Sequence, residues 1–163
     1  MMFFSNRFYK PYLDSNLALM KNTPSKEQVL ETMNRLVKDT LMETLNIKYV
    51  DADPSTGKLV ATMPVDSRVY QPMGILHGGA TVALAESVGS AASQMLIDPS
   101  EEIALGAEIS ANHVKSARTG LLIATAECIH HGKSSHLYHI RVENEQGELI
   151  SMVKLLNFVK QRK

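Results

Sequence analysis

Gly78-Gly-Ala-Thr-Val-Ala-Leu-Ala-Glu-Ser-Val-Gly-Ser-Ala-Ala-Ser93 is a run of small and apolar residues with one charge in it. On a helix these residues leave no broad solvated face, and neighbouring elements can approach closely on all sides. We therefore expect an enclosed helix over about residues 78–96, which ends near Asp98-Pro99. The single charge is Glu86. A carboxylate in enclosed surroundings is costly unless it is paired, hydrogen-bonded or protonated, so Glu86 needs a reason.

Segments of β type lie on both sides of this helix. Two precede it, at 47–53 and 58–65, and the turn Asp53-Pro54-Ser55-Thr56-Gly57 joins them into a hairpin. Four follow it, at 103–115, 119–130, 135–143 and 149–159, with short connections that predict an antiparallel meander. One long apolar helix and six strands predict an α+β fold in which the sheet curls round the helix.

Residues 1–45 form a separate N-terminal segment in this interpretation, and residues 46–163 form the main domain. A helix is expected from Thr23-Pro24 or the capping box Ser25-x-x-Gln28 to about Leu45. Apolar residues recur in it at spacings of three and four, which predicts an amphipathic helix on a surface. Five aromatic residues fall within the first twelve positions. We expect them to pack on the chain's own body or on a sister subunit, or to cover a ligand site.

Composition narrows the function. The chain has 163 residues, enough for one core, and its 17 basic and 17 acidic residues give zero net charge. The chain therefore has no excess positive charge that would attract nucleic acid or acidic lipid. The single cysteine, Cys128, cannot form an internal disulfide, and no run matches an export signal or a membrane span. We expect a cytoplasmic protein with neither a nucleic-acid nor a membrane partner.

The start of the enclosed helix, His77-Gly78-Gly79, is a second candidate site. Two glycines let a ligand approach free backbone N–H groups at the positive end of the helix dipole, although a glycine pair also serves tight packing. Gly78 and Glu86 are eight residues apart, or about 12 Å along a helix axis, so one substrate carbonyl cannot touch both in one chain. If they share a site, a second subunit supplies Glu86 from an antiparallel helix, which implies at least a dimer.

Three motifs resemble the hotdog-fold acyl-CoA thioesterases, in the PaaI-like branch that includes 4-hydroxybenzoyl-CoA and 1,4-dihydroxy-2-naphthoyl-CoA thioesterases. The motifs are Gln71-Pro-Met-Gly-Ile-Leu-His77-Gly78-Gly79, Leu84-Ala-Glu86-Ser-Val-Gly-Ser90 and Ala111-Asn112-His113-Val114. The resemblance covers about residues 46–159. It implies a six-stranded antiparallel sheet wrapped around one central helix, hydrolysis of an acyl-CoA substrate, and a homodimer or homotetramer.

The resemblance also implies residue roles. The Gly78 amide lies on the thioester oxygen, with Gln71 as a further polar contact. Glu86 is a general base on water or a nucleophile that forms a mixed anhydride. Ser90, one turn later on the same helix face, holds the water or the carboxylate, and His77 orients the loop. The predicted substrate-binding residues are Gly79, Asn112, His113, Lys133 and Ser134.

No metal or organic cofactor is required by this chemistry, and the histidines show no zinc-site spacing. Lys115, Arg118 and Lys133 are candidates for the CoA phosphates, and each is equally an ordinary solvated charge. Pocket walls are expected from Met73, Val88 and Met95. Two alternatives stay open, a hotdog hydratase or dehydratase and a non-catalytic acyl-CoA-binding module. A binding-only pocket, however, has no need of a buried carboxylate.

Overall fold

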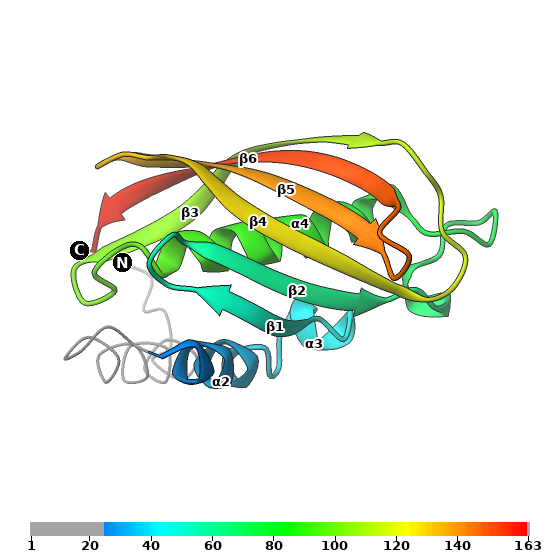
Figure 1. Ribbon diagram of the computed structural model, residues 1–163, viewed down its shortest axis with the longest axis horizontal. Coiled ribbons are helices and arrows are strands. Elements are labelled where there is room, and N and C mark those ends of the chain that lie inside the picture. Colours follow the sequence, from blue (N-terminus) through cyan, green and yellow to red (C-terminus); the bar gives the residue numbers. More distant parts are fainter. Residues whose placement is uncertain (1–24, 163) are drawn as a thin grey trace, which may run out of the picture.

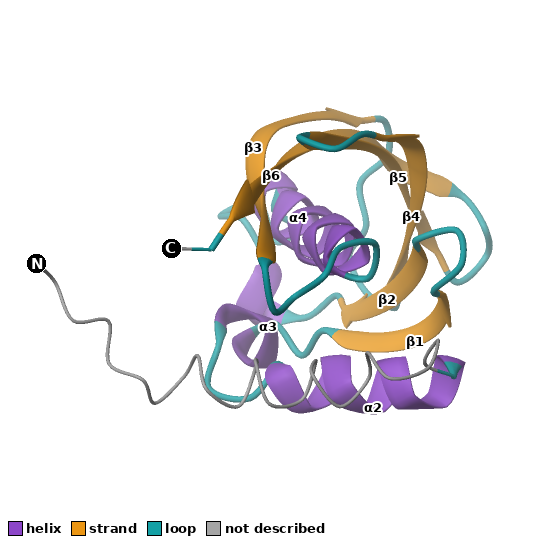
Figure 2. Ribbon diagram, turned by 90° about the vertical axis from the view of Figure 1, so that its left-hand side faces the viewer, coloured by secondary structure: helices purple, strands orange, loops and turns teal. Residues whose placement is uncertain are grey.

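The computed structural model describes residues 25–162 (Figure 1). One long helix, α4 (Gly78–Gln94), lies inside a curved six-stranded sheet, which confirms the α+β arrangement (Figure 2). The strands are β1 (Lys48–Asp53), β2 (Lys58–Pro64), β3 (Glu102–His113), β4 (Leu121–His131), β5 (Ser135–Asn144) and β6 (Leu149–Gln161). Two short helices, α2 (Lys26–Leu36) and α3 (Leu41–Thr44), precede the sheet, and a 3₁₀ turn, η1 (Ser67–Val69), follows β2. No helix within residues 25–162 is long and apolar enough to cross a membrane.

The strand order is β1-β2-β4-β5-β6-β3, and all neighbours are antiparallel. The strands β4, β5 and β6 form the expected meander, but the prediction that β3 belongs to it is wrong, because β3 pairs with β6 at the edge of the sheet. The segment after β3 is a crossover and not a hairpin turn. The carbonyl of Ala117 accepts from the Leu76 N–H at 2.8 Å, and that of Gly120 accepts from the Val65 N–H at 2.9 Å. These bonds fix the segment between β3 and β4 where it crosses one end of the curled sheet (Figure 1).

The core lies between α4 and the concave face of the sheet. Strand β2 alternates strictly between buried and partly buried residues, as a sheet with one enclosed face requires. Small residues on α4 let the sheet approach: a Cβ on Gly89 would lie 2.6 Å from Leu155 Cδ2. The fully buried members of this core include Leu59, Met63, Leu84, Val88, Leu122, Ile140, Val142 and Leu155. Each such side chain contributes about 1.5–3 kcal/mol through removal from water.

The N-terminal helix differs from the prediction, because it breaks at residue 36 and restarts at residue 41. Asp39 adopts a left-handed φ of 61°, which no helix interior accepts. Thr40 then caps α3, and its Oγ accepts from the Met42 N–H at 3.2 Å. The capping box of Ser25 and Gln28 is present as expected. The boundary after residue 45 stays a prediction, and the aromatic cluster of the first twelve positions lies outside the described residues.

His136 is a buried histidine on β5, and it is only 1% exposed. Its Nδ1 lies 2.7 Å from the Ser93 hydroxyl oxygen. Burial, together with the neighbouring His131 and His130, lowers the pKa of His136 from 6.5 to about 4. The unfolded chain therefore binds a proton more readily than the folded chain. The resulting stability is fully present above the unfolded pKa and is lost as the pH falls from about 6.5 towards 4.

We expect His136→Gln, which keeps a hydrogen-bonding group but does not titrate, to flatten this acid dependence. Urea unfolding at pH 7 and pH 5 checks it. The wild-type free energy of unfolding falls by up to about 2 kcal/mol more than that of the variant across this interval. His139→Gln, at an exposed position of the same strand, serves as the control. Parallel losses in wild type and His136→Gln would contradict the assignment.

Candidate active site

Glu86 projects from the middle of α4 towards the edge strand β3. A Cβ on Gly106 of β3 would lie 2.0 Å from Glu86 Oε1, so the carboxylate occupies the space that any other residue at position 106 would fill. The β3–β6 register shifts between Gly106 and Glu108, which marks a β-bulge next to the carboxylate. The Ser90 hydroxyl, one turn further along α4, lies 3.1 Å from Glu86 Oε1. The partly buried carboxylate of Glu86 therefore lies directly against the backbone of β3 at a position that has no side chain.

A cavity of about 460 Å³ opens beside this carboxylate, with Glu86 and Ser90 in its lining. Its apolar wall comes largely from outside the central helix. The wall residues are Met33 and Leu36 of α2, Met42 of α3, Ala91 of α4, and Ile103, Ala104 and Leu105 near the start of β3. The cavity therefore joins one charged group to an otherwise mostly apolar space, as small-molecule sites commonly do.

The residues expected to wall the pocket do not line this cavity. Val88 lies on the opposite side of α4 and is completely buried in the core. Met73 lies in the loop before α4 and is 70% exposed. Met95 follows the last turn of α4. Helical periodicity alone gave no information about which side of an enclosed helix faces a space and which side faces the sheet.

The other candidate group lies at the first turn of α4. His77 is the N-cap residue, and its Nδ1 accepts from the Gly79 N–H at 2.8 Å. The Gly79 donor is therefore engaged, whereas the Gly78 N–H has no acceptor within residues 25–162. His113 at the end of β3 covers Gly78 closely, since a Cβ on Gly78 would lie 2.7 Å from His113 Nε2. The free donor thus sits at a helix N-terminus under an imidazole ring.

A second cavity, of about 280 Å³, brings Gln71, Gly78 and His113 together. The Gln71 amide nitrogen donates to the Leu76 carbonyl at 3.3 Å, which holds the loop before α4 in a turn. Asn112 is exposed and precedes His113 on β3, and its carbonyl accepts from the Ser151 hydroxyl at 3.2 Å. Three of the sequence-predicted site residues therefore share one cavity, with Asn112 as their exposed neighbour.

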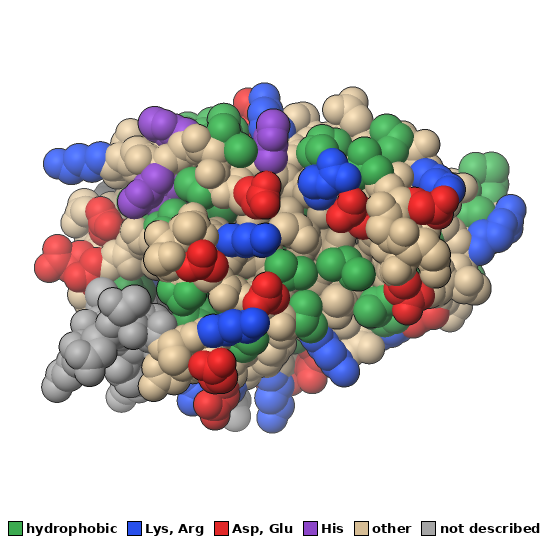
Figure 3. Space-filling view, in the orientation of Figure 1, with side chains coloured by type: hydrophobic (Ala, Val, Ile, Leu, Met, Phe, Trp, Pro, Cys, Tyr) green, Lys and Arg blue, Asp and Glu red, His purple; other side chains and the backbone are tan. Residues whose placement is uncertain are grey.

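The remaining candidates lie apart from both cavities or are engaged elsewhere. Lys133 and Ser134 are exposed in the turn between β4 and β5. Lys115 lines the second cavity and forms an ion pair with Glu148 at 2.5 Å. Arg118 donates to the Gly74 carbonyl at 3.5 Å. Basic and acidic side chains are interspersed on the face drawn in Figure 3, without a field of one sign. Within residues 25–162 no three His, Cys, Asp or Glu side chains gather as a metal site would require.

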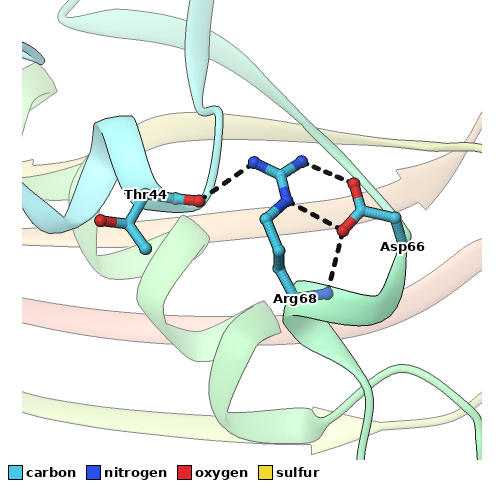
Figure 4. A network of polar contacts seen from close by, with 3 residues as sticks. All are labelled: Thr44, Asp66 and Arg68. Atoms are coloured by element: carbon cyan, nitrogen blue, oxygen red, sulfur yellow. Dashed lines mark hydrogen bonds and ion pairs between the residues drawn. The ribbon is translucent and has the colours of Figure 1, made fainter.

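The loop that leads to Gln71 is tied to the N-terminal helices by one arginine (Figure 4). Arg68 in η1 donates to both carboxylate oxygens of Asp66, at 2.9 and 2.5 Å, and to the Thr44 carbonyl at 3.1 Å. The hydrogen bonds from Arg68 hold the pKa of Asp66 at about 2. This bidentate pair is a structural brace between α3 and the loop.

The two halves of the predicted site are separate in one chain. Glu86 and Ser90 line one cavity, and Gly78, Gln71 and His113 line the other, as their spacing along α4 requires. Strand β3 passes both, with Gly106 beside Glu86 and His113 beside Gly78. On its outer side β3 pairs with no strand within residues 25–162. Within one chain, therefore, the Gly78 N–H and the Glu86 carboxylate do not face a common cavity.

Comparison with known proteins identifies the family. Residues 73–151 match the family model described as the thioesterase superfamily. The 1,4-dihydroxy-2-naphthoyl-CoA hydrolase of Listeria monocytogenes is 40% identical over 123 residues, which cover 76% of this chain and 98% of that protein. The chain belongs to the thioesterase superfamily. This thioesterase is also 39% identical over 126 residues to the Escherichia coli protein of the same name, covering 77% of this chain and 90% of that one.

A crystal structure supports the same assignment. A mutant thioesterase from Pseudomonas aeruginosa superposes on this thioesterase with a TM-score of 0.80 at 38% identity, covering 88% of this chain and 99% of that one. The hotdog fold and a thioester hydrolase activity are thereby confirmed for this chain.

Sequence reasoning missed several residues that shape the site of this thioesterase. Met33 and Leu36 belong to the apolar stripe of the predicted N-terminal helix, whose spacing gives no sign of a cavity, and Met42 lies outside that stripe. Gly106 had a signal, because an isolated glycine inside a β-type segment often marks a bulge or a close approach. Asn157 also had one, since an amide follows Val153 and Leu155 at inward-facing positions of β6.

Proposed function

We propose that this thioesterase hydrolyses an acyl-CoA to the free acid and CoA, with Glu86 as base or nucleophile. The observation that carries the proposal is that the same helix presents a carboxylate beside an apolar cavity and an unengaged N–H at Gly78. The CoA moiety is proposed from the relatives, whose names specify a naphthoyl-CoA substrate. A hydratase or a binding module on the same fold has less use for this pair.

The chemistry follows from these two groups. As a base, Glu86 takes a proton from water while the water oxygen bonds to the thioester carbon. The carbonyl oxygen becomes an oxyanion, which the Gly78 N–H stabilises at the helix N-terminus. Collapse breaks the C–S bond, and the CoA thiolate takes up the proton. As a nucleophile, Glu86 itself bonds to the carbon, CoA leaves as thiolate, and water then hydrolyses the mixed anhydride.

The acyl group is proposed to be an aryl or a short-to-medium chain. The cavity beside Glu86 holds about 460 Å³, within the range of small-ligand sites. Its walls are methionine and aliphatic side chains, which suit an apolar acyl group and adapt to its shape. Lys133 and Ser134 remain proposed contacts for the nucleotide part.

A homodimer would unite the two halves of the site. If β3 pairs with its own copy in antiparallel fashion, with the two-fold axis between Ile109 and Ser110, then His113 lies opposite Gly106 of the partner subunit. The Gly78 N–H then approaches Glu86 of the partner subunit, and small residues such as Ala83 let the two α4 helices lie close together. Two such dimers would form the proposed homotetramer, and a cytoplasmic location is part of the same proposal.

Thiol release from a panel of CoA thioesters tests the function. The panel contains benzoyl-, hydroxybenzoyl-, phenylacetyl- and hexanoyl-CoA, and at least one is expected to turn over without added metal or cofactor. The order of kcat/KM among them reports the acyl preference. Tight binding of these thioesters with no release of thiol from any of them would favour the acyl-CoA-binding module instead.

We expect Leu36→Trp to restrict the acyl range. Leu36 is partly exposed and lines the cavity, so an indole there removes volume without opening the core. KM for benzoyl- and phenylacetyl-CoA should rise by about 10-fold, whereas that for acetyl-CoA should change by less than about 2-fold, because lost contacts act on the larger group. Leu30→Trp is the matched control, on the same helix but away from the cavity. An equal change in KM for all substrates would argue against Leu36 as part of the wall that contacts the acyl group.

A further inference from the structure

Asn157 is a buried amide directly behind the carboxylate site. It is 0% exposed on β6, where it follows Ser151, Val153 and Leu155 in the inward-facing row. In the sheet it lies opposite Gly106 of β3 on one side and opposite His136 of β5 on the other. An amide in such a row costs free energy unless its hydrogen bonds are made, so its contacts indicate what it does.

The amide orientation is set by α4. Asn157 Nδ2 donates to the Gly89 carbonyl at 3.4 Å. The reverse orientation would place two acceptor oxygens against each other there. Asn157 Oδ1 therefore faces the Ser90 hydroxyl, 3.2 Å away.

Ser90 faces two acceptors with one proton. Its oxygen lies 3.1 Å from Glu86 Oε1 and 3.2 Å from Asn157 Oδ1. A hydroxyl has one hydrogen, so it donates to one of them at a time. While Glu86 is ionised, the charged oxygen is the stronger acceptor and holds the Ser90 proton. In that state the Asn157 oxygen receives no hydrogen bond from Ser90 but lies close enough to accept one.

We propose that Asn157 is a positioning residue that accepts the Ser90 hydroxyl when Glu86 loses its negative charge during thioester hydrolysis. This inference rests on the proposed function of Glu86. Glu86 becomes neutral at the chemical step in both routes, by gaining a proton from water or by forming an anhydride. As a base, the new Glu86 O–H donates to the Ser90 oxygen, and the Ser90 hydroxyl rotates to donate to Asn157. Only hydrogen bonds are exchanged in this rotation.

Other titratable groups near the site are few. Tyr49 of β1 lines the same cavity, and its hydroxyl donates to the Ser87 carbonyl at 3.2 Å. His136 is bonded to Ser93, and burial holds its pKa at about 4, so it is neutral above pH 5. Glu108 of β3 and Lys154 of β6 form an exposed ion pair. Strands β2 and β4 face α4 with apolar residues. A difference between variants in the pH profile of kcat therefore reports on Glu86 and its contacts.

Asn157→Leu tests the proposal. We expect kcat to fall by about 10-fold, the effect of one hydrogen bond, while KM stays within about 2-fold. The acid limb of the kcat profile should move to lower pH, because neutral Glu86 is no longer favoured through Ser90. Asn157→Asp keeps an acceptor and adds a negative charge, so it should move the limb to higher pH. Val153→Ala, buried on the same face of β6, controls for general destabilisation.

A double-mutant cycle with Ser90→Ala shows whether Asn157 acts through Ser90. In that background, Asn157→Leu should change kcat by less than about 2-fold. The inference is overturned if Asn157→Leu matches Val153→Ala in kcat and in pH profile, or if its effect is undiminished in Ser90→Ala. Glu86→Gln separates the two claims. If that variant retains activity, the proposed function is overturned. If it loses activity while Asn157→Leu keeps the wild-type rate, only the role of Asn157 is overturned.

Discussion

Glu86→Gln should release thiol from any accepted acyl-CoA at no more than about 1% of the wild-type rate. Glutamine has the size of glutamate, and its amide oxygen can still accept from Ser90, so the cavity keeps its shape. The amide can neither take a proton from water nor attack the thioester, and loss of such a group typically costs 10²–10⁴-fold in kcat, by order of magnitude. The measurement is kcat and KM on the best substrate of the panel, at equal folded concentration.

The control for this variant is Glu108→Gln, which removes an exposed carboxylate of β3 paired with Lys154. That variant should keep activity within about 2-fold, since exposed ion pairs contribute little. Near-wild-type turnover by Glu86→Gln would remove the carboxylate from the mechanism.

Mixing two inactive variants tests the shared site. Gly78→Pro removes the free N–H. The backbone of proline suits the first turn of a helix after the extended His77, and its Cβ would displace the His113 ring, whose Nε2 would otherwise lie 2.7 Å away. Subunits that exchange at random give one intact site in each mixed dimer, so a mixture with Glu86→Gln should recover about a quarter of wild-type activity. A site completed within one chain would recover none.

The second large effect is expected from Gly106→Ala, which should lower kcat by about 10- to 100-fold and leave the fold intact. The new methyl group would lie 2.0 Å from Glu86 Oε1, so the carboxylate must swing away from its place beside Ser90. The displaced atoms are the far end of a flexible side chain, so stability changes little, whereas a misplaced catalytic group is costly. Steady-state kinetics and thermal unfolding measure the two effects.

Glu127→Ala, at an exposed position of β4 away from the proposed dimer edge, is the control for this experiment. It should match wild type in kcat. If Gly106→Ala does so too, the carboxylate acts from some other position than the one it occupies here.

Local patterns predicted most of the fold. The small-residue helix, the Pro-Gly turn and the alternating strands depend on neighbours in sequence, and they lie within a few residues of their expected bounds. The placement of β3 could not be read in the same way. Segment 114–120 resembles a hairpin connection in composition, and its crossover depends on bonds to Leu76 and Ile150, which are distant in sequence.

For the site, as for the fold, the local features could be predicted and the long-range ones could not. Glu86 and Gly78 could be singled out because a charge and a glycine pair are conspicuous on an apolar helix, and their spacing excluded a site within one chain. The cavity wall could not be predicted, because the stripe that contains Met33 and Leu36 faces partly the sheet and partly an opening beside β3. The break between the two N-terminal helices, at the left-handed residue Asp39, determines which residues of the stripe face the sheet and which face the opening. The continuous amphipathic pattern of the sequence gives no sign of this break.

The open edge of β3 has a consequence for how the activity is controlled. If each subunit carries two half-sites, the concentration of working enzyme is set by mass action between chains. Specific activity should then fall on dilution below the dissociation constant of the dimer and return on concentration. A cell that makes little of this chain would hold folded protein with almost no turnover, and a modest rise in synthesis would increase the catalytic rate more than in proportion.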